Sequence, residues 1–218
     1  MRIAIIGTGN VGKALGATFA RAGNSVIYAA ASPDSSRKVA KEVGGTAAES
    51  VREAAAEADM VVIAVPYASA GHTVASEIAP VVDGKIVIDV TNPLTPDSSR
   101  LATEGGPSGA EHFASWLPGA HVVKAFNTLF ASIQADPRSH GVEIDALFAT
   151  DNADARARVG ALLRSLGFRP VYVGPLARAR ELEAMAFMNI QLQMNAEGEW
   201  KTSYSLLCPP KGSVDQRG

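Results

Sequence analysis

The sequence has little of several features that mark whole classes of protein. Only one of its 218 residues is a cysteine, Cys208, so no disulfide bond can form within the chain. Aromatic residues make up 6% of the chain, which is few for a large all-β core. The net charge of −2 argues against a protein that coats nucleic acid.

Long hydrophobic runs and targeting segments are also missing. No apolar stretch approaches the roughly 20 residues that span a bilayer. Met1 leads directly into the apolar run Arg2–Ile6, without the succession of basic region, long apolar run and cleavage site that marks a signal peptide. No His, Cys or carboxylate residues have the spacing of metal ligands. We therefore expect a cytoplasmic protein that binds no membrane, nucleic acid or metal.

Small residues are abundant instead. The chain has 38 alanines and 20 glycines, which suits helices packed closely on a sheet. Its apolar content of 47% is enough for a sizeable core. The length predicts one dinucleotide-binding domain over residues 1–175. Residues 176–218 are expected to add a helix and a tail, packed on that domain or at a dimer interface.

Strand and helix patterns alternate along the chain, which predicts a parallel sheet covered on both faces. This is an α/β fold of the doubly wound Rossmann type. The segment Leu94–Pro107 is polar and predicts a surface loop that can act as a lid, and no prediction is made after Gly198. The expected strands are Arg2–Ile6, Ser25–Ala29, Met60–Val65, Ile86–Val90, His121–Phe126, Ala146–Thr150 and Pro170–Val173. The expected helices are Val11–Ala22, 32–43, Glu49–Glu57, Ser69–Ala79, Ala110–Trp116, Asn152–Leu166 and Leu176–Asn195.

A glycine-rich run between the first strand and the first helix is the strongest motif. Gly7 permits a tight turn, Gly9 lets the backbone approach a pyrophosphate, and Gly12 lets the helix pack on the strand. The free N–H groups at the start of the helix favour phosphate. This context predicts a dinucleotide site built on Gly7-Thr8-Gly9-Asn10-Val11-Gly12.

The end of the second strand bears on the choice of nucleotide. NAD-binding proteins usually carry Asp or Glu there, but this chain has Ala31 followed by Ser32. An uncharged end tolerates a 2′-phosphate, which Ser32, Arg37 and Lys38 are placed to reach. Arg37 and Lys38 are equally well explained as solvated helix residues. We favour NADP over NAD.

Three segments follow strands at the carboxyl edge of the predicted sheet, where ligands bind in such folds. Val65-Pro66 and Tyr67 follow the third strand, Asn92-Pro93 follows the fourth, and Lys124 and Asn127 end the fifth. The two asparagines are candidates for ligand contacts, although asparagine often satisfies loop backbone groups.

Together these residues resemble the NADP-dependent oxidoreductases of the deazaflavin coenzyme F420. The resemblance is carried by Gly7–Gly12, Val65-Pro66, Thr91–Leu94, Val123–Thr128 and a late segment, Leu182–Ala186. It implies hydride transfer between NADP(H) and the deazaflavin. It also implies a nicotinamide near Pro66 and Asn92, and a deazaflavin between the Lys124–Thr128 turn and the C-terminal helix. Family members commonly carry Arg where this chain has Ala31.

Two other functions remain open. An NAD(P)H-dependent reductase of a small carbonyl or imine would need a proton donor, for which Tyr67 and Lys124 are the candidates at strand ends. A nucleotide-binding module without catalysis would keep the same fold. Only 44 residues follow Gly174, too few for a separate substrate domain, so we expect a homodimer.

Overall fold

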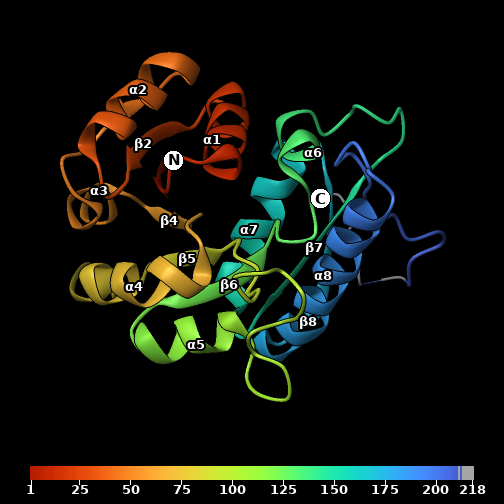
Figure 1. Cartoon of the computed structure of the whole chain (residues 1–218). Coiled ribbons are helices and arrows are strands. Elements are labelled where there is room, and N and C mark those ends of the chain that lie inside the picture. Colours follow the sequence, from red (N-terminus) through yellow and green to blue (C-terminus); the bar gives the residue numbers. More distant parts are fainter. Residues whose placement is uncertain (211, 213–218) are drawn as a thin grey trace.

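The computed structural model describes residues 1–210 and 212, which form a sheet with helices on both faces (Figure 1). The strand order is β3-β2-β1-β4-β5-β6-β7-β8. The strands are β1 (Arg2–Ile6), β2 (Ser25–Ala29), β3 (Thr46–Ala47), β4 (Met60–Ile63), β5 (Ile86–Asp89), β6 (His121–Ala125), β7 (Asp145–Thr150) and β8 (Arg169–Gly174). The α-helices are α1 (Asn10–Arg21), α2 (Pro33–Val43), α3 (Val51–Glu57), α4 (His72–Ile78), α5 (Gly109–Trp116), α6 (Ala131–Ala135), α7 (Ala153–Ser165) and α8 (Ala179–Asn195).

The prediction of a doubly wound Rossmann-type fold is confirmed, but the sheet is not wholly parallel. Strand β7 pairs with β6 in the antiparallel direction, and β8 is parallel to β7. The connection from β6 to β7 holds only the five-residue helix α6, which packs beside α1. A parallel strand needs a crossover that returns along the sheet, usually through a helix, and a helix of five residues rises only about 7.5 Å. The expectation of a parallel sheet is therefore wrong for these last two strands.

The two faces of the sheet are buried under different helices. On β1, Ile3 and Ile5 face the cluster that includes α1, α2, α6 and α7. Ala4 and Ile6 face the cluster that includes α3, α4 and α5. This alternation follows from the two-residue period of a strand, and it explains why the central strands are apolar throughout.

Close packing between α1 and β2 accounts for part of the small-residue content. A Cβ atom placed on Gly16 would lie 2.0 Å from the hydroxyl oxygen of Tyr28. The helix therefore contacts the strand's side chain directly through its backbone. Gly16 is therefore required by the close contact between α1 and Tyr28, and not by the turn that precedes the helix.

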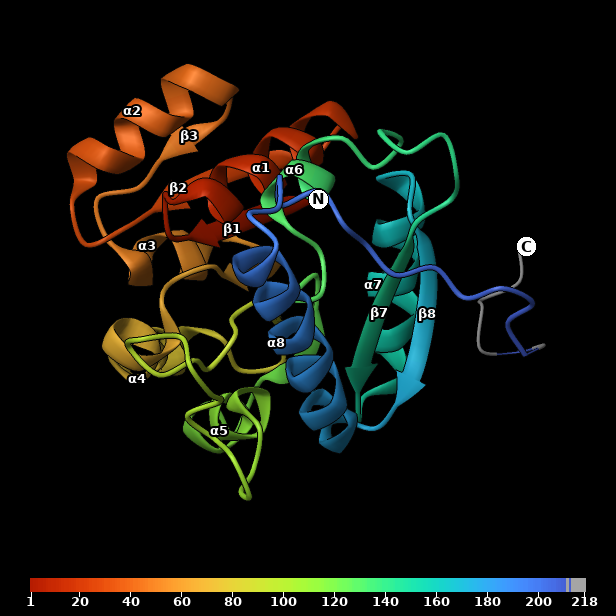
Figure 2. The ribbon, with the colours of Figure 1, turned by 45° about the vertical axis from the view of Figure 1, so that its right-hand side comes forward.

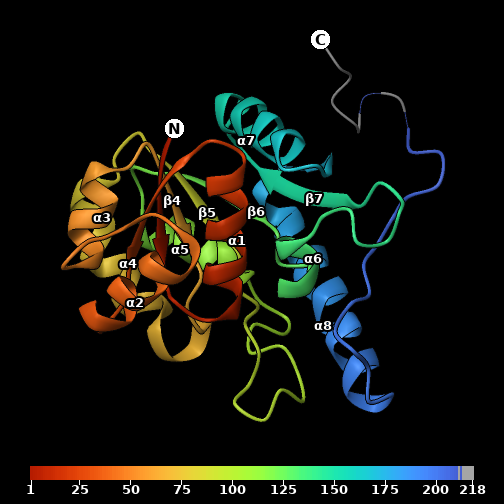
Figure 3. The same ribbon diagram turned by 90° about the horizontal axis from the view of Figure 1, so that it is seen from above.

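The C-terminal helix lies against the strands that follow β6. Leu182 of α8 packs with Leu147 and Val171 on one face of β7 and β8, opposite α7 (Figure 3). Figure 2 shows α8 between α5 and β7. After α8 the chain returns to the sheet, where the Asp145 N–H of β7 donates to the Tyr204 carbonyl oxygen at 3.4 Å. The Tyr204 hydroxyl donates to the Met185 carbonyl oxygen of α8 at 2.7 Å. No helix within the described ranges combines the length and the apolar character that a membrane span requires.

Several local elements differ from the sequence prediction. Strand β3 and helix α6 are short and carry no periodic pattern, so they were not predicted. The predicted helix over Ser69–Ala79 begins as a π-helical turn at Tyr67 and becomes α4 at His72. The Leu94–Pro107 segment is a loop closed by one bridge between Leu94 and Leu101.

The buried hydroxyl of Tyr28 yields a stability prediction. It has no hydrogen-bond partner among the described residues, and burial raises the pKa of Tyr28 to about 12. An unsatisfied buried hydroxyl costs free energy, so Tyr28→Phe should raise the free energy of unfolding by about 1 kcal/mol. Tyr204→Phe removes a hydrogen bond instead and should lower it by about 1 kcal/mol. Urea unfolding measures both changes, and a lower midpoint for Tyr28→Phe would contradict a Tyr28 hydroxyl without a hydrogen-bond partner among the described residues.

Candidate active site

The glycine loop after β1 has two positions that only glycine fits. Gly7 has a φ of +119° and donates its N–H to the Ala29 carbonyl oxygen at 2.8 Å. A Cβ on Gly7 would lie 2.2 Å from the Ala64 carbonyl oxygen. A Cβ on Gly12 would lie 2.0 Å from the Gly7 carbonyl oxygen. Gly7 therefore permits the tight turn after β1, and Gly12 permits α1 to pack closely against that turn.

Gly9 differs from its two neighbours in the motif. It is exposed at the N-terminus of α1, and a Cβ there would meet no described atom within 4 Å. No side chain caps the helix at this position. The terminal N–H groups of a helix attract anions, and here the backbone is open on the side of Gly9. A pyrophosphate has to approach the backbone closely, and the loop permits this at Gly9.

The remaining residues of the loop surround this opening. Asn10 is exposed and begins α1, while Thr8 is half-buried. Val11 packs against the core on the α1 side of the sheet. The structure thus assembles the predicted nucleotide loop in full at the end of β1.

The end of β2 carries a charged cluster on α2. Ser32 caps α2 through its backbone conformation, with no side-chain hydrogen bond, and Ala31 is exposed beside it. Arg37 pairs with Asp34 Oδ1 at 2.8 Å and with Glu49 Oε1 at 2.6 Å. The hydrogen bonds that Arg37 donates to these carboxylates raise the pKa of Arg37. A 2′-phosphate at this place would have to compete with them for the guanidinium.

Lys38 lies exposed on α2, one residue after Arg37. No residue of this cluster is buried, so each side chain can reorient toward a ligand. Ser32 precedes α2, and Arg37 and Lys38 lie exposed within the first two turns of the same helix.

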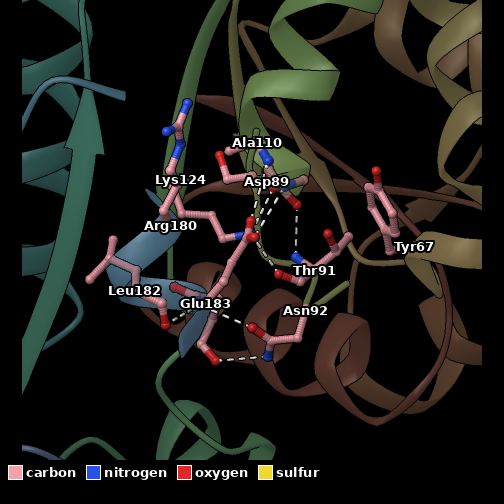
Figure 4. A network of polar contacts seen from close by, with 12 residues as sticks. Tyr67, Asp89, Thr91, Asn92, Ala110, Lys124, Arg180, Leu182 and Glu183 are labelled. Atoms are coloured by element: carbon pink, nitrogen blue, oxygen red, sulfur yellow. Dashed lines mark hydrogen bonds and ion pairs between the residues drawn. The ribbon is translucent and has the colours of Figure 1, made fainter. Parts of the chain in front are cut away.

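A buried lysine organises the carboxyl edge of β5 and β6 (Figure 4). Lys124 Nζ lies 2.8 Å from Asp89 Oδ2 and donates to the Thr91 carbonyl oxygen at 2.7 Å. The Thr91 N–H in turn donates to Asp89 Oδ1 at 2.8 Å. Both polar groups of the Thr91 backbone are therefore held by these two side chains.

Glu183 of α8 completes this arrangement from the other side. Its Oε1 lies 2.8 Å from Lys124 Nζ, and its side chain is 1% exposed. The Gly109 N–H donates to Glu183 Oε2 at 3.1 Å, and the Ala110 N–H donates to Oε1 at 3.3 Å. The carboxylate thus sits at the N-terminus of α5, where the helix dipole favours a negative charge.

This environment sets the protonation state of Lys124. Burial alone would lower the pKa of Lys124, but the charges of Asp89 and Glu183 outweigh burial and raise it. An ammonium group has three N–H donors, and all three acceptors are protein oxygens. The prediction that Lys124 serves as a proton donor to a substrate is therefore at odds with the structure, because its ammonium group is enclosed.

Tyr67 has a partner of its own. Its hydroxyl is hydrogen-bonded to His112 Nδ1 on α5, and its ring stacks on Trp116 with centroids 6.1 Å apart. Burial, together with the charges of Glu183 and Asp89, raises the pKa of Tyr67 to about 12. Figure 4 shows the hydroxyl directed away from Thr91 and Asn92. The ring of Tyr67 therefore packs on α5, next to Phe113 and Trp116.

Two asparagines join neighbouring strand ends. Asn127 Nδ2 donates to Asn92 Oδ1 at 3.0 Å, and Asn92 Nδ2 donates to the Asn127 carbonyl oxygen at 3.0 Å. Asn127 Nδ2 also donates to the Leu182 carbonyl oxygen of α8 at 3.0 Å. Asn92 is half-buried in front of the buried Pro93, and Asn127 is itself buried.

The turn after β6 is strained and has unused polar atoms. Phe126 is fully buried with a φ of +63°, a costly conformation for a bulky residue. Thr91 Oγ1, Asn127 Oδ1 and Thr128 Oγ1 are buried and have no hydrogen-bond partner within residues 1–210. Unsatisfied oxygens at the end of parallel strands fit a ligand with amide or hydroxyl groups. The residues present therefore fit a nicotinamide carboxamide.

The remaining predicted residues border this edge. Pro66 is exposed at the turn after β4, and Val65 is half-buried behind it. Beyond Glu183 lies a cavity of about 360 Å³ between the Leu94–Pro107 loop and α8, lined among others by Leu101, Gly106 and Arg180. Gln191 of α8 donates to the Ser98 carbonyl oxygen at 2.8 Å, which ties this loop to the helix.

Sequence reasoning did not assign a role to Asp89 or Glu183. Asp89 ends an otherwise apolar strand, and Glu183 falls on the buried face of α8 between Leu182 and Ala186. Charged residues are almost never fully buried unless they are paired. The sequence signal for this cluster was the presence of three charged residues, Asp89, Lys124 and Glu183, within apolar segments.

The fold and this edge define the class of protein. A glycine loop open at Gly9, a helix N-terminus and unsatisfied oxygens at the next strand ends are the parts of a Rossmann-type nucleotide-dependent oxidoreductase. The sequence profile of the family "NADP oxidoreductase coenzyme F420-dependent" matches residues 2–93. The chain is also 34% identical over 210 residues to the F420-dependent NADP reductase of Methanothermobacter thermautotrophicus, covering 89% of this chain and 90% of that protein. The chain therefore belongs to the family of coenzyme F420-dependent NADP oxidoreductases, and its class is that of the NADP-dependent oxidoreductases.

The chain is also similar to proteins with other names. The rat (Rattus norvegicus) metalloreductase STEAP3 is 31% identical over 187 residues, and the match covers 84% of this chain but only 36% of that protein. A solved Arthrobacter sp. FB24 protein, proposed to be an F420-dependent NADP reductase, superposes with a TM-score of 0.83 at 27% identity, over 93% of this chain and 99% of that one. An imine reductase from Myxococcus stipitatus in complex with NADP⁺ has a TM-score of 0.70 at 18% identity, over 90% of this chain and 63% of that one, and shares the fold alone.

The contrast between Gly9 and Gly12 gives a direct test of the nucleotide loop. Gly9→Ala places its methyl group in open space, so the unfolding midpoint should stay near that of the parent while NADPH affinity falls at least about tenfold. Gly12→Ala overlaps the Gly7 carbonyl oxygen and should lower stability by about 1–3 kcal/mol. Calorimetric titration and thermal unfolding separate the two effects. If a folded Gly9→Ala variant binds NADPH as tightly as the parent, the nucleotide does not bind at the glycine loop.

Proposed function

We propose that this protein transfers hydride between NADP(H) and a deazaflavin coenzyme of the F420 type. The observation that carries the proposal is the likeness to the Methanothermobacter reductase over nearly the whole length of both proteins. The open glycine loop and the unsatisfied oxygens at the ends of β5 and β6 supply a nucleotide site of the required kind.

Each part of the nucleotide has candidate partners. The pyrophosphate is assigned to the loop from Gly7 to Gly12, with Gly9 as the point of closest approach. The 2′-phosphate is assigned to the end of β2, where Ser32, Arg37 and Lys38 stand near the exposed Ala31. The nicotinamide end is assigned to the edge formed by Val65, Pro66, Asn92, Pro93 and Asn127.

The second substrate is assigned to the space between the β6 turn and α8. The cavity beside Glu183 and the Leu94–Pro107 loop lies at this place and is large enough to hold part of a flat ring system. Arg180 lines the cavity and forms a bidentate ion pair with Glu111 at 2.7 and 2.8 Å. Its guanidinium is about half exposed, so it can contact a ligand from that position.

The chemistry makes modest demands on this chain. When bound, NADP(H) supplies the hydride, and the protein has to hold donor and acceptor carbons close together and exclude water. The two asparagines, which are hydrogen-bonded to each other, provide a rigid edge for this purpose. A carbonyl or imine reductase would need a side chain that delivers a proton, and Tyr67 and Lys124 are engaged by other protein groups. This geometry favours transfer between two carriers.

A spectroscopic assay tests the proposal. Mixing the protein with NADPH and oxidised coenzyme F420 should bleach the visible band of the deazaflavin. The Gly9→Ala variant serves as a control, because it should fold and yet lose most of this turnover. Tight NADPH binding with no bleaching over hours would refute the deazaflavin as second substrate. Turnover of a small imine or carbonyl under the same conditions would support the alternative.

We infer further that two copies of the chain associate through α8, as part of the C-terminal extension 176–218. Met188, Leu192 and Met194 are large apolar side chains that lie about half exposed on this helix. Exposed apolar surface of this kind is typical of protein interfaces. Because α8 also borders the proposed substrate cavity, a second copy would help to close it.

Sedimentation at micromolar concentration tests this association. The parent chain should sediment as a dimer, and Leu192→Glu should shift it to the monomer by placing a charge in an apolar contact. Ala157→Glu on the exposed side of α7 is the matched control and should leave the dimer intact. A parent chain that sediments as a monomer would rule the dimer out.

A further inference from the structure

Asp89, Lys124 and Glu183 form a buried charge cluster that joins four parts of the fold. Asp89 ends β5, Lys124 belongs to β6, and Glu183 belongs to α8. Each of the three side chains is at most 1% exposed. The amides of Gly109 and Ala110 add the N-terminus of α5. None of these groups is needed for hydride transfer itself, so their burial requires another explanation.

Packing alone does not explain the buried charge cluster. Removing charges from water is costly, and apolar side chains of similar volume often stabilise a fold as well or better. What apolar side chains cannot do is hold a loop backbone at defined points. Here the cluster holds the Thr91 N–H through Asp89 and the Thr91 carbonyl oxygen through Lys124.

The contacts continue from Thr91 into a closed ring (Figure 4). Asn92 follows Thr91 and is bonded to Asn127, and Asn127 Nδ2 donates to the Leu182 carbonyl oxygen. Leu182 precedes Glu183, which returns to Lys124. The turn at the end of β5 and the helix α8 are thus connected twice, once through the asparagines and once through the charges.

We propose that the buried charge cluster is a positioning device, which holds the Thr91–Pro93 turn against α8 so that Asn92 and Asn127 present a fixed edge to the nicotinamide. Asp89, Lys124 and Glu183 are positioning residues, since they act through Thr91 and Leu182 and touch no ligand. The inference rests on the proposed NADP(H) site. It predicts that loss of the cluster weakens binding of the nicotinamide half of the nucleotide and spares the phosphate contacts at the glycine loop and at the end of β2.

The double variant Asp89→Asn/Lys124→Met is the sharpest test. It removes one negative and one positive charge, so the net charge of the cluster is unchanged. The amide oxygen introduced by Asp89→Asn can still accept the Thr91 N–H, whereas the Thr91 carbonyl oxygen loses its donor. Calorimetry should give NADPH affinity about tenfold below the parent, and unchanged affinity for 2′,5′-ADP, which lacks the nicotinamide.

A matched control removes an exposed ion pair on the same helix. Arg178→Met/Glu181→Gln also deletes one pair of opposite charges, at the surface of the start of α8. It should bind both ligands as the parent does. Equal weakening of NADPH and 2′,5′-ADP in the double variant would indicate a merely structural role and overturn the proposal. Unchanged binding of both ligands in a folded double variant would overturn it as well.

Hydrogen exchange on the parent chain tests the same coupling if the double variant does not fold. NADPH should slow amide exchange in the segment around Leu182 and Glu183, and 2′,5′-ADP should not. Equal exchange with both ligands would refute the coupling. These binding measurements need no deazaflavin. If the parent binds NADPH but does not reduce coenzyme F420, the proposed function is refuted. The comparison of NADPH with 2′,5′-ADP still tests the role of the buried charge cluster in that case.

Discussion

The enclosed ammonium group of Lys124 is the contact on which the arrangement of the carboxyl edge depends. It has no solvent around it, so its charge is balanced only by Asp89 and Glu183. A buried charge without partners is far more costly than an exposed one, and this cost makes the three side chains mutually dependent. Because they come from β5, β6 and α8, the same dependence ties the C-terminal helix to the sheet.

The glycines show how one residue type serves different purposes within a few positions. Gly7 and Gly12 lie where a Cβ atom would overlap a carbonyl oxygen, so they are required by the fold itself. Gly9 lies where a Cβ atom would meet nothing, so the fold does not require it. The fold alone would accept a side chain at position 9. The glycine at this position is therefore best explained by a ligand that approaches the backbone there.

The sequence was informative where the pattern is local. Apart from the two-residue strand β3, the order of strands and helices up to β6 and the place of the glycine loop follow from periodicity and from glycine spacing. The direction of β7 was predicted wrongly, because it depends on α6, a helix too short to show a periodic pattern. Lys124 was correctly placed at a strand end, but its partners were missed because Asp89 and Glu183 lie 35 and 59 residues away along the chain.

The sequence by itself determined the fold class, the position of the glycine loop between β1 and α1, and the family, since each rests on residues close together in the chain or on their order. Only the tertiary structure decided which side chains are free to meet a ligand. Lys124 and Tyr67 stand at strand ends in the sequence, yet one is enclosed by two carboxylates and the other is bonded to His112. Burial and pairing arise when distant segments pack together, and no local pattern records them.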